Sequence, residues 1–437
     1  MEIALIGVAI LMIVLFVGIP LGMGLMLVGY FGFAFVHPRG FTAANSVAGQ
    51  QILELALNFQ FSVLPLFVLM GVFVARAQLS DDLYDASNKW LGHFRGGLAM
   101  ATVVACGGFA AVSGSSAATA ATMAKVAVPS MRKYGYADSL SAGTVAAGGT
   151  MGILIPPSAA LIIYGLLTEE DIAKLFVAGI IPGLITVAAY IAVIKIVTAI
   201  WPEMGPRGDR ASWDQRLRSL YKVWGVLALF FLIMGGIFFG VFTSTEAGGI
   251  GAAGAFIFAI VRRRMSWKIL YDSLIEGAIT TAMIFTVAFG ALILNQFINI
   301  SGMPNAMLGL INNLDASPLQ VVLVIMAFYV ILGMFIEGIA MIFLTVPIFV
   351  PVIVGLDFGF SDVLIWWGII LVMVVEISLI TPPIGLNVFI LKSMLPEVPL
   401  TTIFKGITPF FCADLFRLAI VVIFPAVALW LPTLMFN

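Results

Sequence analysis

Long apolar stretches, several of them interrupted by small or polar residues, follow one another along this chain of 437 residues. Residues 3–36 are apolar for longer than the roughly 20 residues that one bilayer crossing needs. The interruption GIPLG at 18–22 predicts either two short segments or one broken helix. A polar, mildly amphipathic segment at 77–95 is expected along the membrane interface. Membrane spans are predicted at 52–74, 141–166, 175–200, 223–243, 247–261, 274–300 and 406–431.

Two stretches have a small or polar middle between apolar arms, which favours a hairpin that enters the membrane and returns to the same side. The first is 96–130, with the centre CGGFAAVSGSSAATAATM at 106–123, and the second is 319–356. In hydrocarbon, irregular backbone survives only inside protein or beside a wet cavity, because each unpaired N–H or C=O costs several kcal/mol. We therefore expect two re-entrant hairpins, each with a binding loop at its tip.

Two other apolar stretches carry interruptions that predict broken helices. The span at 141–166 contains Gly148-Gly149 and Pro156-Pro157, and a later span is interrupted at Thr381-Pro382-Pro383. Simple kinks are the other interpretation of these prolines. Broken helices expose carbonyl and N–H groups near the membrane midplane, where they can hold a cation and an anion together.

The same landmarks recur in order in the two halves of the chain. Val128-Pro129 and Val350-Pro351 end the hairpins, a diproline follows each, and FVAGIIP at 176–182 is similar to FKGITP at 404–409. Chance pairing among 20 prolines is the competing explanation. The order and nearly equal spacing favour an inverted repeat. The predicted divisions are 1–95 (scaffold spans and interfacial arm), 96–200 (first transport half), 201–222 (cytoplasmic loop), 223–317 (central scaffold spans) and 318–437 (second transport half with the last span).

The positions of the charges predict the orientation of the chain. Most of the 21 Lys and Arg residues fall around the first hairpin, in the polar loop 201–222, at Arg262–Arg264 and beside the last span. The positive-inside rule makes that side cytoplasmic. A loop rich in Asn and Pro after residue 300 is expected on the other side, together with the acidic residues Glu169, Glu170, Asp171, Asp315, Asp357 and Asp362.

Composition excludes several classes of function. The chain is 62% hydrophobic and 10% charged, with a mean hydropathy of +1.14, which is typical of polytopic helical membrane proteins and excludes a soluble one. The net charge of -1 indicates no nucleic-acid partner, and lipid is the expected surroundings. The sequence has no HExxH, CxxC, nucleotide loop or Ser/His/Asp order, so we predict a protein that is not an enzyme.

The hairpin tips and broken helices supply the candidate binding residues. Close helix packing is the competing interpretation of small residues in membranes, but the polar centre at 113–116 is too dense for packing alone. The candidates in the first half are Ser113, Gly114, Ser115, Ser116, Thr119, Gly149, Thr150, Gly152 and Pro156. Those in the second half are Glu337, Gly338, Thr345, Thr381, Pro382, Gly385 and Asn387.

Ionisable residues within apolar spans need a function or a partner. Glu337 at the second tip either coordinates a cation or pairs with a base. Asp414 and Arg417 lie three residues apart, which favours a salt bridge, with a contact from Arg417 to a substrate carboxylate as the second possibility. The sequence leaves the roles of Lys125 and Glu376 open.

Four motifs together resemble the large membrane subunit of tripartite ATP-independent periplasmic (TRAP) transporters: FAAVSGSSAATAATM (109–123), GGTMGILIPPSAALIIYG (148–165), FIEGIAMIFLTVPIFVPV (335–352) and ITPPIGLNVFIL (380–391). The resemblance implies an all-α polytopic protein of the bacterial inner membrane with the inverted-repeat fold of the ion transporter superfamily. It also implies two re-entrant hairpins, two broken helices and an elevator-type mechanism. The partners implied are a small four-helix membrane subunit and a soluble periplasmic substrate-binding protein.

The resemblance also implies import driven by inward sodium. Its sodium sites carry over to Ser113, Ser115, Gly149, Gly152, Glu337, Gly338 and Thr381, and no organic cofactor is implied. The implied substrate is a C4-dicarboxylate, another small carboxylate or a sugar acid such as sialate. The alternatives are a single-component sodium symporter for dicarboxylate or citrate, and a channel-like membrane protein.

Overall fold

Every regular element in the described part of the chain is helical. The computed structural model describes residues 2–313 and 316–436. Asp315, one of the acidic residues expected on the side opposite the cytoplasm, therefore lies outside the described residues. Among these described residues, six segments are long and apolar enough to cross a membrane. They are Phe59–Arg76, Ile172–Ile200, Trp213–Phe238, Ser244–Val261, Trp267–Ile300 and Leu400–Ile423.

The N-terminal and central parts form one group of packed helices. Of the two possibilities for residues 3–36, the structure shows two helices, and α2 lies so close to α13 that a Cβ added at Gly290 would sit 2.4 Å from the Gly22 carbonyl oxygen. Small residues permit this approach between helices. The helices are α1 (Glu2–Phe16), α2 (Leu21–Val36), α3 (Gly40–Leu57), α4 (Val63–Arg76), α5 (Leu79–Leu91), α11 (Trp213–Phe238), α12 (Ser244–Val261), α13 (Trp267–Ile300) and α14 (Met303–Asn313).

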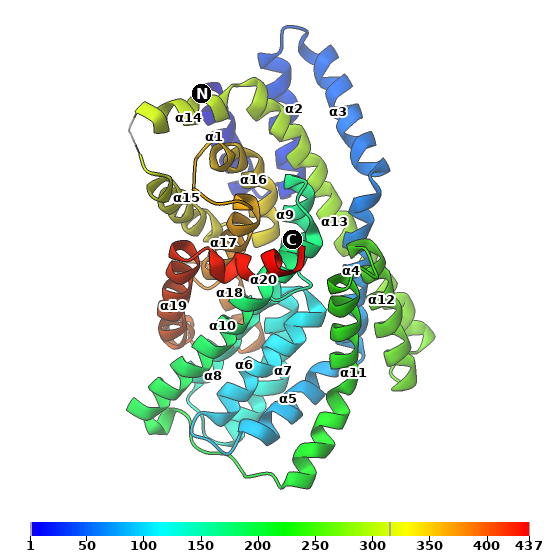
Figure 1. The fold of residues 1–437 in the computed structure, drawn as a ribbon, viewed down its shortest axis with the longest axis vertical. Helices are drawn as coiled ribbons and strands as arrows, with labels where there is room; N and C mark the ends of the chain where they lie inside the picture. Colours follow the sequence, from blue (N-terminus) through cyan, green and yellow to red (C-terminus); the bar gives the residue numbers. More distant parts are fainter. Residues whose placement is uncertain (1, 314–315, 437) are drawn as a thin grey trace.

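The other two groups repeat one order of elements: a helical hairpin, a broken helix and a long helix with an internal proline (Figure 1). The hairpin α6/α7 lies in the lower part of Figure 1, and α15/α16 lies in the upper part. The first group is α6 (Gly97–Ser113), α7 (Ser116–Lys133), α8 (Asp138–Thr150), the 3₁₀ turn η2 (Met151–Ile153), α9 (Ala159–Thr168) and α10 (Ile172–Ile200). The second is α15 (Pro318–Gly333), α16 (Gly338–Val354), α17 (Val363–Ser378), α18 (Leu386–Met394), α19 (Leu400–Ile423) and α20 (Ala426–Phe436).

Four predicted boundaries were wrong. The span expected at 52–74 is divided, because Asn58 ends α3 and its side chain accepts a hydrogen bond from the Gln60 N–H at 3.0 Å. The loop expected after residue 300 contains α14, and the loop at 201–222 becomes helical at Trp213. The last span is two helices, since Pro425 follows the end of α19 and cannot continue it. The functional division of the chain into scaffold and transport parts stays a prediction.

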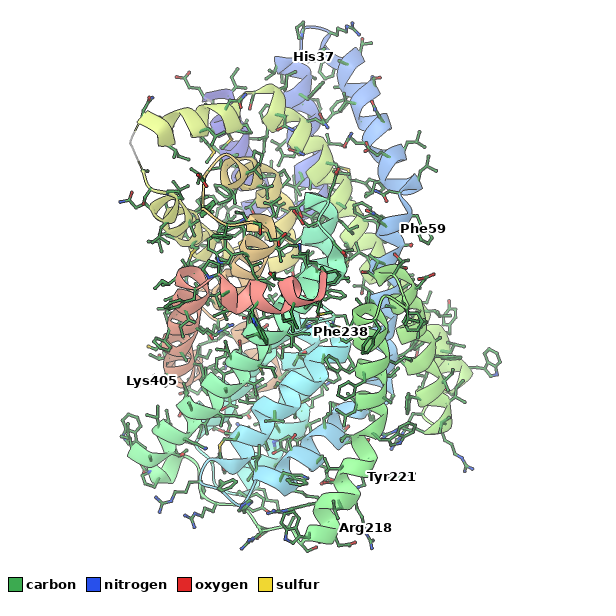
Figure 2. All side chains as sticks on the ribbon, in the orientation of Figure 1. His37, Phe59, Arg218, Tyr221, Phe238 and Lys405 are labelled. Carbon is green, nitrogen blue, oxygen red and sulfur yellow. The ribbon has the colours of Figure 1, made fainter. Side chains whose placement is uncertain are left out.

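Basic side chains that bear on the orientation lie in the lower half of the molecule. Arg218 and Lys405 are found there in Figure 2, and His37 lies at the upper end. This arrangement agrees with the orientation predicted from the positive-inside rule, in which the lower end faces the cytoplasm.

In the described structure two ion pairs connect the repeated groups. Each joins a connection between helices of the first group to a connection between helices of the second. Arg132, at the end of α7, contacts Glu397 in the α18–α19 connection at 2.5 Å. Lys174, at the start of α10, contacts Asp362 in the α16–α17 connection at 2.6 Å. In the repeat, the α7–α8 connection corresponds to α16–α17, and α9–α10 corresponds to α18–α19. The two ion pairs are therefore related by the repeat.

Reversing the charge of Lys174 is expected to destabilise the protein by about 1 kcal/mol, because a partly exposed ion pair becomes a contact between two acids. The Lys174→Asp variant should show a lower melting temperature in detergent, and adding Asp362→Lys should restore it. Asp214→Lys is the matched control, because Asp214 pairs with Arg218 where both side chains are well exposed. A double reversal that remains as unstable as Lys174→Asp would contradict this account of the pair.

Candidate functional site

The first hairpin turns on two residues. Gly114 has φ +61°, a left-handed conformation that glycine adopts without strain, and it ends α6. Ser115 is extended and caps α7, because its hydroxyl oxygen accepts a hydrogen bond from the Ala118 N–H at 3.3 Å. The Thr119 hydroxyl donates to the Ser115 carbonyl at 2.7 Å and lies 3.1 Å from the Ser113 hydroxyl. The tip is thus lined with neutral oxygen atoms, and Ser116 beside it is buried.

The first broken helix stops after Thr150, whose hydroxyl donates to the Ala147 carbonyl at 2.8 Å. The chain passes through η2 and a buried cis Pro156-Pro157 bond before α9 begins. Ser158 caps α9 by accepting a hydrogen bond from the Leu161 N–H, and its hydroxyl donates to the Ile153 carbonyl. Side-chain and backbone groups therefore replace the helical hydrogen bonds that the break removes.

The first tip packs directly against this break. A Cβ added at Gly152 would lie 2.4 Å from the Ser115 carbonyl oxygen, and one at Gly149 would lie 2.7 Å from the Ala120 Cβ. A Cβ at Gly114 would lie 3.0 Å from the Pro157 carbonyl oxygen and 3.5 Å from the Ala159 nitrogen. The N-termini of α7 and α9 therefore come close together. All the candidates of the first half lie in these two adjoining segments.

The second hairpin has a longer turn between Gly333 and Gly338. Glu337 caps α16, because its carboxylate accepts a hydrogen bond from the Ala340 N–H at 3.1 Å. Within the described residues Glu337 forms no salt bridge, so of its two predicted roles the pairing with a base is not found there. Added Cβ atoms at Gly333 and Gly338 would clash with Ser378 and Val375, which places this tip against the end of α17.

Thr345 does not belong to the tip. Its hydroxyl lies in the buried contact between α15 and α16, where it touches the Tyr329 hydroxyl and donates to the Met341 carbonyl at 2.7 Å. The prediction that Thr345 joins the binding residues of the second half is therefore not supported by its position.

The second break resembles the first in position but is more exposed. The Thr381 hydroxyl donates to the Ile377 carbonyl at 2.6 Å, and Gly385, with φ +59°, precedes α18. The Pro382-Pro383 bond is also cis, and both prolines are exposed. Asn387 is fully buried and donates from its amide to the Ala146 carbonyl of α8 at 3.3 Å, while its Oδ1 has no partner in the described structure. Asn387 thus joins the second break to the first half.

The predicted residues form two neighbouring groups rather than one. The first tip, the first break and Asn387 make one group, and the second tip with the end of α17 makes the other. Glu337 borders a cavity of about 240 Å³ that it shares with Phe16 and Leu21 at the break between α1 and α2. Lys125 borders a separate cavity of about 340 Å³ beside Arg132 and Glu397.

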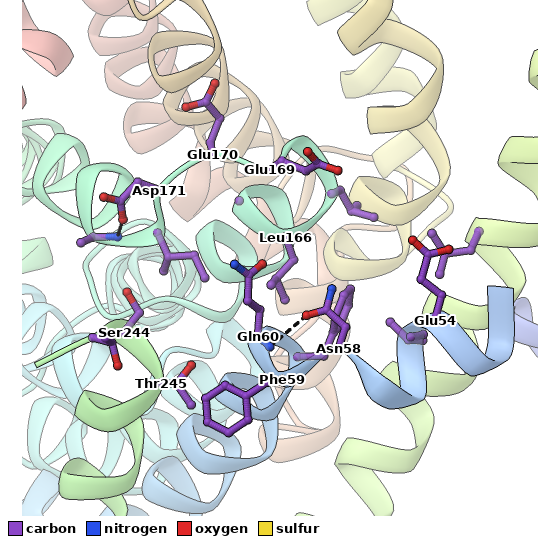
Figure 3. A pocket seen from close by; sticks show the side chains of 18 of the residues that line it. Glu54, Asn58, Phe59, Gln60, Leu166, Glu169, Glu170, Asp171, Ser244 and Thr245 are labelled. Atoms are coloured by element: carbon purple, nitrogen blue, oxygen red, sulfur yellow. Dashed lines mark hydrogen bonds between the residues drawn. The ribbon is translucent and has the colours of Figure 1, made fainter. Parts of the chain in front are cut away.

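A cavity of about 1400 Å³ contains none of the predicted binding residues (Figure 3). It lies where the α3–α4 break faces the α9–α10 and α11–α12 turns, and its lining includes Glu54, Glu169, Glu170 and Asp171. No Lys or Arg is among its lining residues. Because four carboxyl groups and no basic side chain are among the described lining residues, this cavity is unfavourable for binding an anion.

Sequence reasoning missed one buried cluster of charges. Arg417 contacts Asp414 at 2.7 Å, as predicted, but its other nitrogen atoms donate to Glu376 at 2.5 Å and to Thr186 at 2.8 Å. Asp414 also accepts a hydrogen bond from the Tyr190 hydroxyl at 3.0 Å. Each of the three nitrogen atoms of the buried Arg417 guanidinium therefore has a partner within the protein, which argues against its alternative role as a substrate ligand. The sequence showed a charge at Glu376 within the apolar run of α17, but it did not show that Arg417 is the partner of this residue.

The structure describes no cluster of three or more His, Cys, Asp or Glu side chains that could hold a metal ion. Hard cations are bound by oxygen ligands, and hydroxyl and carbonyl oxygen atoms occur at the tips and breaks. The sodium ligands named from the resemblance stay a prediction.

Comparisons with known proteins show which family this chain is similar to. The family model described as "Tripartite ATP-independent periplasmic transporter, DctM component" matches residues 8–427. The C4-dicarboxylate TRAP transporter large permease protein DctM of Pseudomonas aeruginosa is 36% identical, with 87% of this chain and 88% of the relative covered. The ectoine/5-hydroxyectoine large permease protein UehC of Ruegeria pomeroyi is 32% identical, with 98% of each covered. The sialic acid large permease protein SiaM of Vibrio cholerae is 30% identical, with 96% of each covered.

The fold is similar to that of a solved transporter. The crystal structure of the YdaH transporter of Alcanivorax borkumensis superposes with a TM-score of 0.61 at 13% identity, over 91% of this chain and 90% of that one. At this identity the similarity shows the fold alone. Taken with the family match, it leads to one assignment: the chain belongs to the DctM family of TRAP transporter large permease subunits, which are multi-pass proteins of the bacterial inner membrane and not enzymes.

Proposed function

We propose that this subunit imports a small organic acid, coupled to inward sodium, by moving its two repeated groups together across the membrane. One observation carries the proposal: the N-termini of α7 and α9 converge where the first tip packs against the first break. Each helix N-terminus carries about half a positive charge, and free backbone N–H groups point from it. Such a site can hold a carboxylate without a fixed cation.

The neutral oxygen atoms beside these N-termini suit the coupling ion. The hydroxyls of Ser113 and Thr119 lie 3.1 Å apart at the first tip, and Oδ1 of Asn387, whose amide contacts Ala146 on α8, has no partner in the described residues. A sodium ion bound there would add positive charge next to the substrate carboxylate, and each would favour the binding of the other. This reciprocity is the physical basis of the coupling that we propose.

The repeated order of elements supports the proposed movement. Two equivalent hairpins from opposite membrane faces, each re-entrant and each packed on a broken helix, would give the site a barrier on either side. The ion pairs Arg132–Glu397 and Lys174–Asp362 join the two groups, which favours movement as one body of the elevator type. The remaining helices, α1–α5 and α11–α14, would form the fixed scaffold.

The proposed partners follow from membership in a tripartite system. We propose that a small four-helix membrane subunit binds the scaffold and that a soluble periplasmic protein delivers the substrate. The substrate class is a C4-dicarboxylate, another carboxylate or a sugar acid such as sialate. The relatives are named for C4-dicarboxylate, sialic acid and ectoine, so all three compounds belong in the test.

Uptake into proteoliposomes tests the proposal directly. Vesicles that hold the chain with its small subunit should accumulate labelled succinate, sialate or ectoine only when the binding protein and an inward sodium gradient are both present. Accumulation without the binding protein would instead support a single-component symporter. Flux that neither saturates nor depends on sodium would support a channel and would contradict the proposed coupling.

Replacing Ser115 or Thr381 by leucine is expected to reduce sodium-driven uptake about 100-fold, because each variant removes a hydroxyl and fills the tip or the break. Insertion into the membrane should be unchanged. Thr408→Leu is the matched control, because Thr408 also donates to the carbonyl four residues earlier but lies on the exposed side of α19. Normal uptake by both site variants would contradict the site assignment.

A further inference from the structure

The cluster around Arg417 joins helices from both repeated groups. Thr186 and Tyr190 come from α10 of the first group, Glu376 comes from α17, and Asp414 and Arg417 come from α19 of the second. Arg417 is 1% exposed, and the other four residues are fully buried. The cluster is therefore an internal junction between the two groups and does not contact solvent.

The residues of this junction are equivalent in the repeat. Thr150 and Glu376 each lie six residues before the first proline of their diproline, and Tyr190 and Arg417 each lie eight residues after the internal proline of their long helix. The equivalent residues also meet in space, since the Thr150 hydroxyl lies close to both the Glu376 carboxyl group and the Tyr190 hydroxyl. The junction thus lies on the axis that relates the two groups, with neutral side chains from the first and ions from the second.

The position of Glu376 links the junction to both breaks. Glu376 lies in the last turn of α17, and the nearby Thr150 is the last residue of α8, between Gly149 and Gly152. One carboxylate oxygen of Glu376 accepts from Arg417, and the other, Oε1, has no hydrogen-bond partner in the described part of the chain. The Thr150 hydroxyl, which donates to the Ala147 carbonyl, is the polar group of the first break that lies close to this carboxyl group. A small shift of either break therefore changes the surroundings of this oxygen.

We propose that Glu376 is a positioning residue that couples the two breaks, so that binding at one favours the bound geometry of the other. Arg417 holds the carboxylate, and the carboxylate sets the distance between the last turns of α17 and α8. This inference rests on the proposed sodium-coupled function. It adds that sodium binding in the two repeated groups is cooperative and that Glu376 transmits the cooperativity.

The test compares Glu376→Ala with Glu376→Gln in the chain reconstituted with its small subunit and binding protein. Alanine removes the link but leaves Arg417 and Asp414 as a neutral pair, so the variant is expected to fold. Its sodium concentration for half-maximal uptake should rise about tenfold, and the steepness of the sodium dependence should fall. Glutamine can accept from Arg417 and donate to Thr150, so its sodium dependence should stay close to that of the wild type.

A double-mutant cycle with Thr150→Val separates coupling from direct binding. If Thr150 acts through Glu376, the effects of Glu376→Ala and Thr150→Val should not add, whereas two independent ligands would give additive effects. Thr186→Val is the matched control, because it removes a contact of Arg417 on α10 and leaves both Glu376 and Thr150 in place. Its sodium dependence should equal that of the wild type.

Two outcomes distinguish the failure of this inference from the failure of the proposed function. Wild-type uptake that ignores sodium would remove the proposed function itself. Sodium-dependent wild-type uptake with an unchanged sodium dependence in Glu376→Ala would overturn only the positioning role. As a readout without transport, sodium should raise the melting temperature of the purified wild type more than that of Glu376→Ala, with choline as the reference cation.

Discussion

The Gly152→Ala variant is expected to reach the membrane and to lose uptake by about 100-fold. Its new Cβ would lie 2.4 Å from the Ser115 carbonyl oxygen and 2.8 Å from the Ser116 nitrogen. An unstrained contact is about 1 Å longer, so the first tip must move away from the break. The neighbouring atoms are backbone, which cannot rotate aside as a flexible side chain can. The measurement is initial uptake into proteoliposomes, normalised to inserted protein.

A matched glycine separates this clash from a general effect of alanine. Gly235 lies within α11, and a Cβ added there meets nothing within 4 Å. Gly235→Ala should therefore retain wild-type uptake. If Gly152→Ala transports as well as Gly235→Ala does, the close packing of the tip on the break is not required for transport, and the geometry proposed for the site is wrong.

The Arg417→Met variant is expected to lose most of its folded protein. Methionine leaves the carboxylates of Asp414 and Glu376 buried without their cation, and removing one partner of such a group costs about 3–5 kcal/mol. Fluorescence-detected gel filtration and melting in detergent should show aggregation and a much lower melting temperature than the wild type.

A variant in which the same cluster carries no charge tests whether unpaired charge causes the instability of Arg417→Met. Combining Arg417→Met with Asp414→Asn and Glu376→Gln removes every ion while keeping the side-chain volumes similar, so most of the folded protein should return. A triple variant as unstable as Arg417→Met would show that lost packing of the arginine stem, and not unpaired charge, causes the instability. A stable Arg417→Met would show that the cluster does not depend on its cation.

The sequence contained enough local information to predict where the hairpin tips and the helix breaks lie. Gly114 and Ser115 form the turn of the first hairpin because glycine adopts a positive φ and serine caps the following helix. Each diproline interrupts its helix because proline has no N–H to donate. The contact between Gly152 and Ser115 could not be predicted, since it depends on how two segments separated by the helices α7 and α8 pack together.

Hydropathy placed some helix ends incorrectly for physical reasons. The apolar average over 52–74 hid Asn58, whose side chain starts a short 3₁₀ turn and so separates α3 from α4. The Asn- and Pro-rich stretch after residue 300 looked like a loop, but Pro304 lies in the first turn of α14, where a missing N–H is harmless. Averages over a window do not resolve single residues that cap or interrupt a helix.

The contact from Glu376 to Arg417 spans α17 and α19, and sequence spacing gave no sign of it. The contact between Asp414 and Arg417 was predictable because residues three apart share one face of a helix. Partners on different helices become visible only when the packing of those helices is known. The charge itself was visible, so the sequence indicated that Glu376 needed a partner without identifying it.

The two ion pairs between the repeated groups have a consequence for the descent of this chain. In both pairs the base, Arg132 or Lys174, belongs to the first group, and the acid, Glu397 or Asp362, belongs to the second. Two identical copies of one group, placed in the same relative arrangement as the two groups of this chain, would bring base against base or acid against acid at these contacts. If the chain arose by duplication of a shorter gene, its two halves have since acquired complementary charges. Two copies of the same half could then no longer pair with each other as two copies of the ancestral protein would have done.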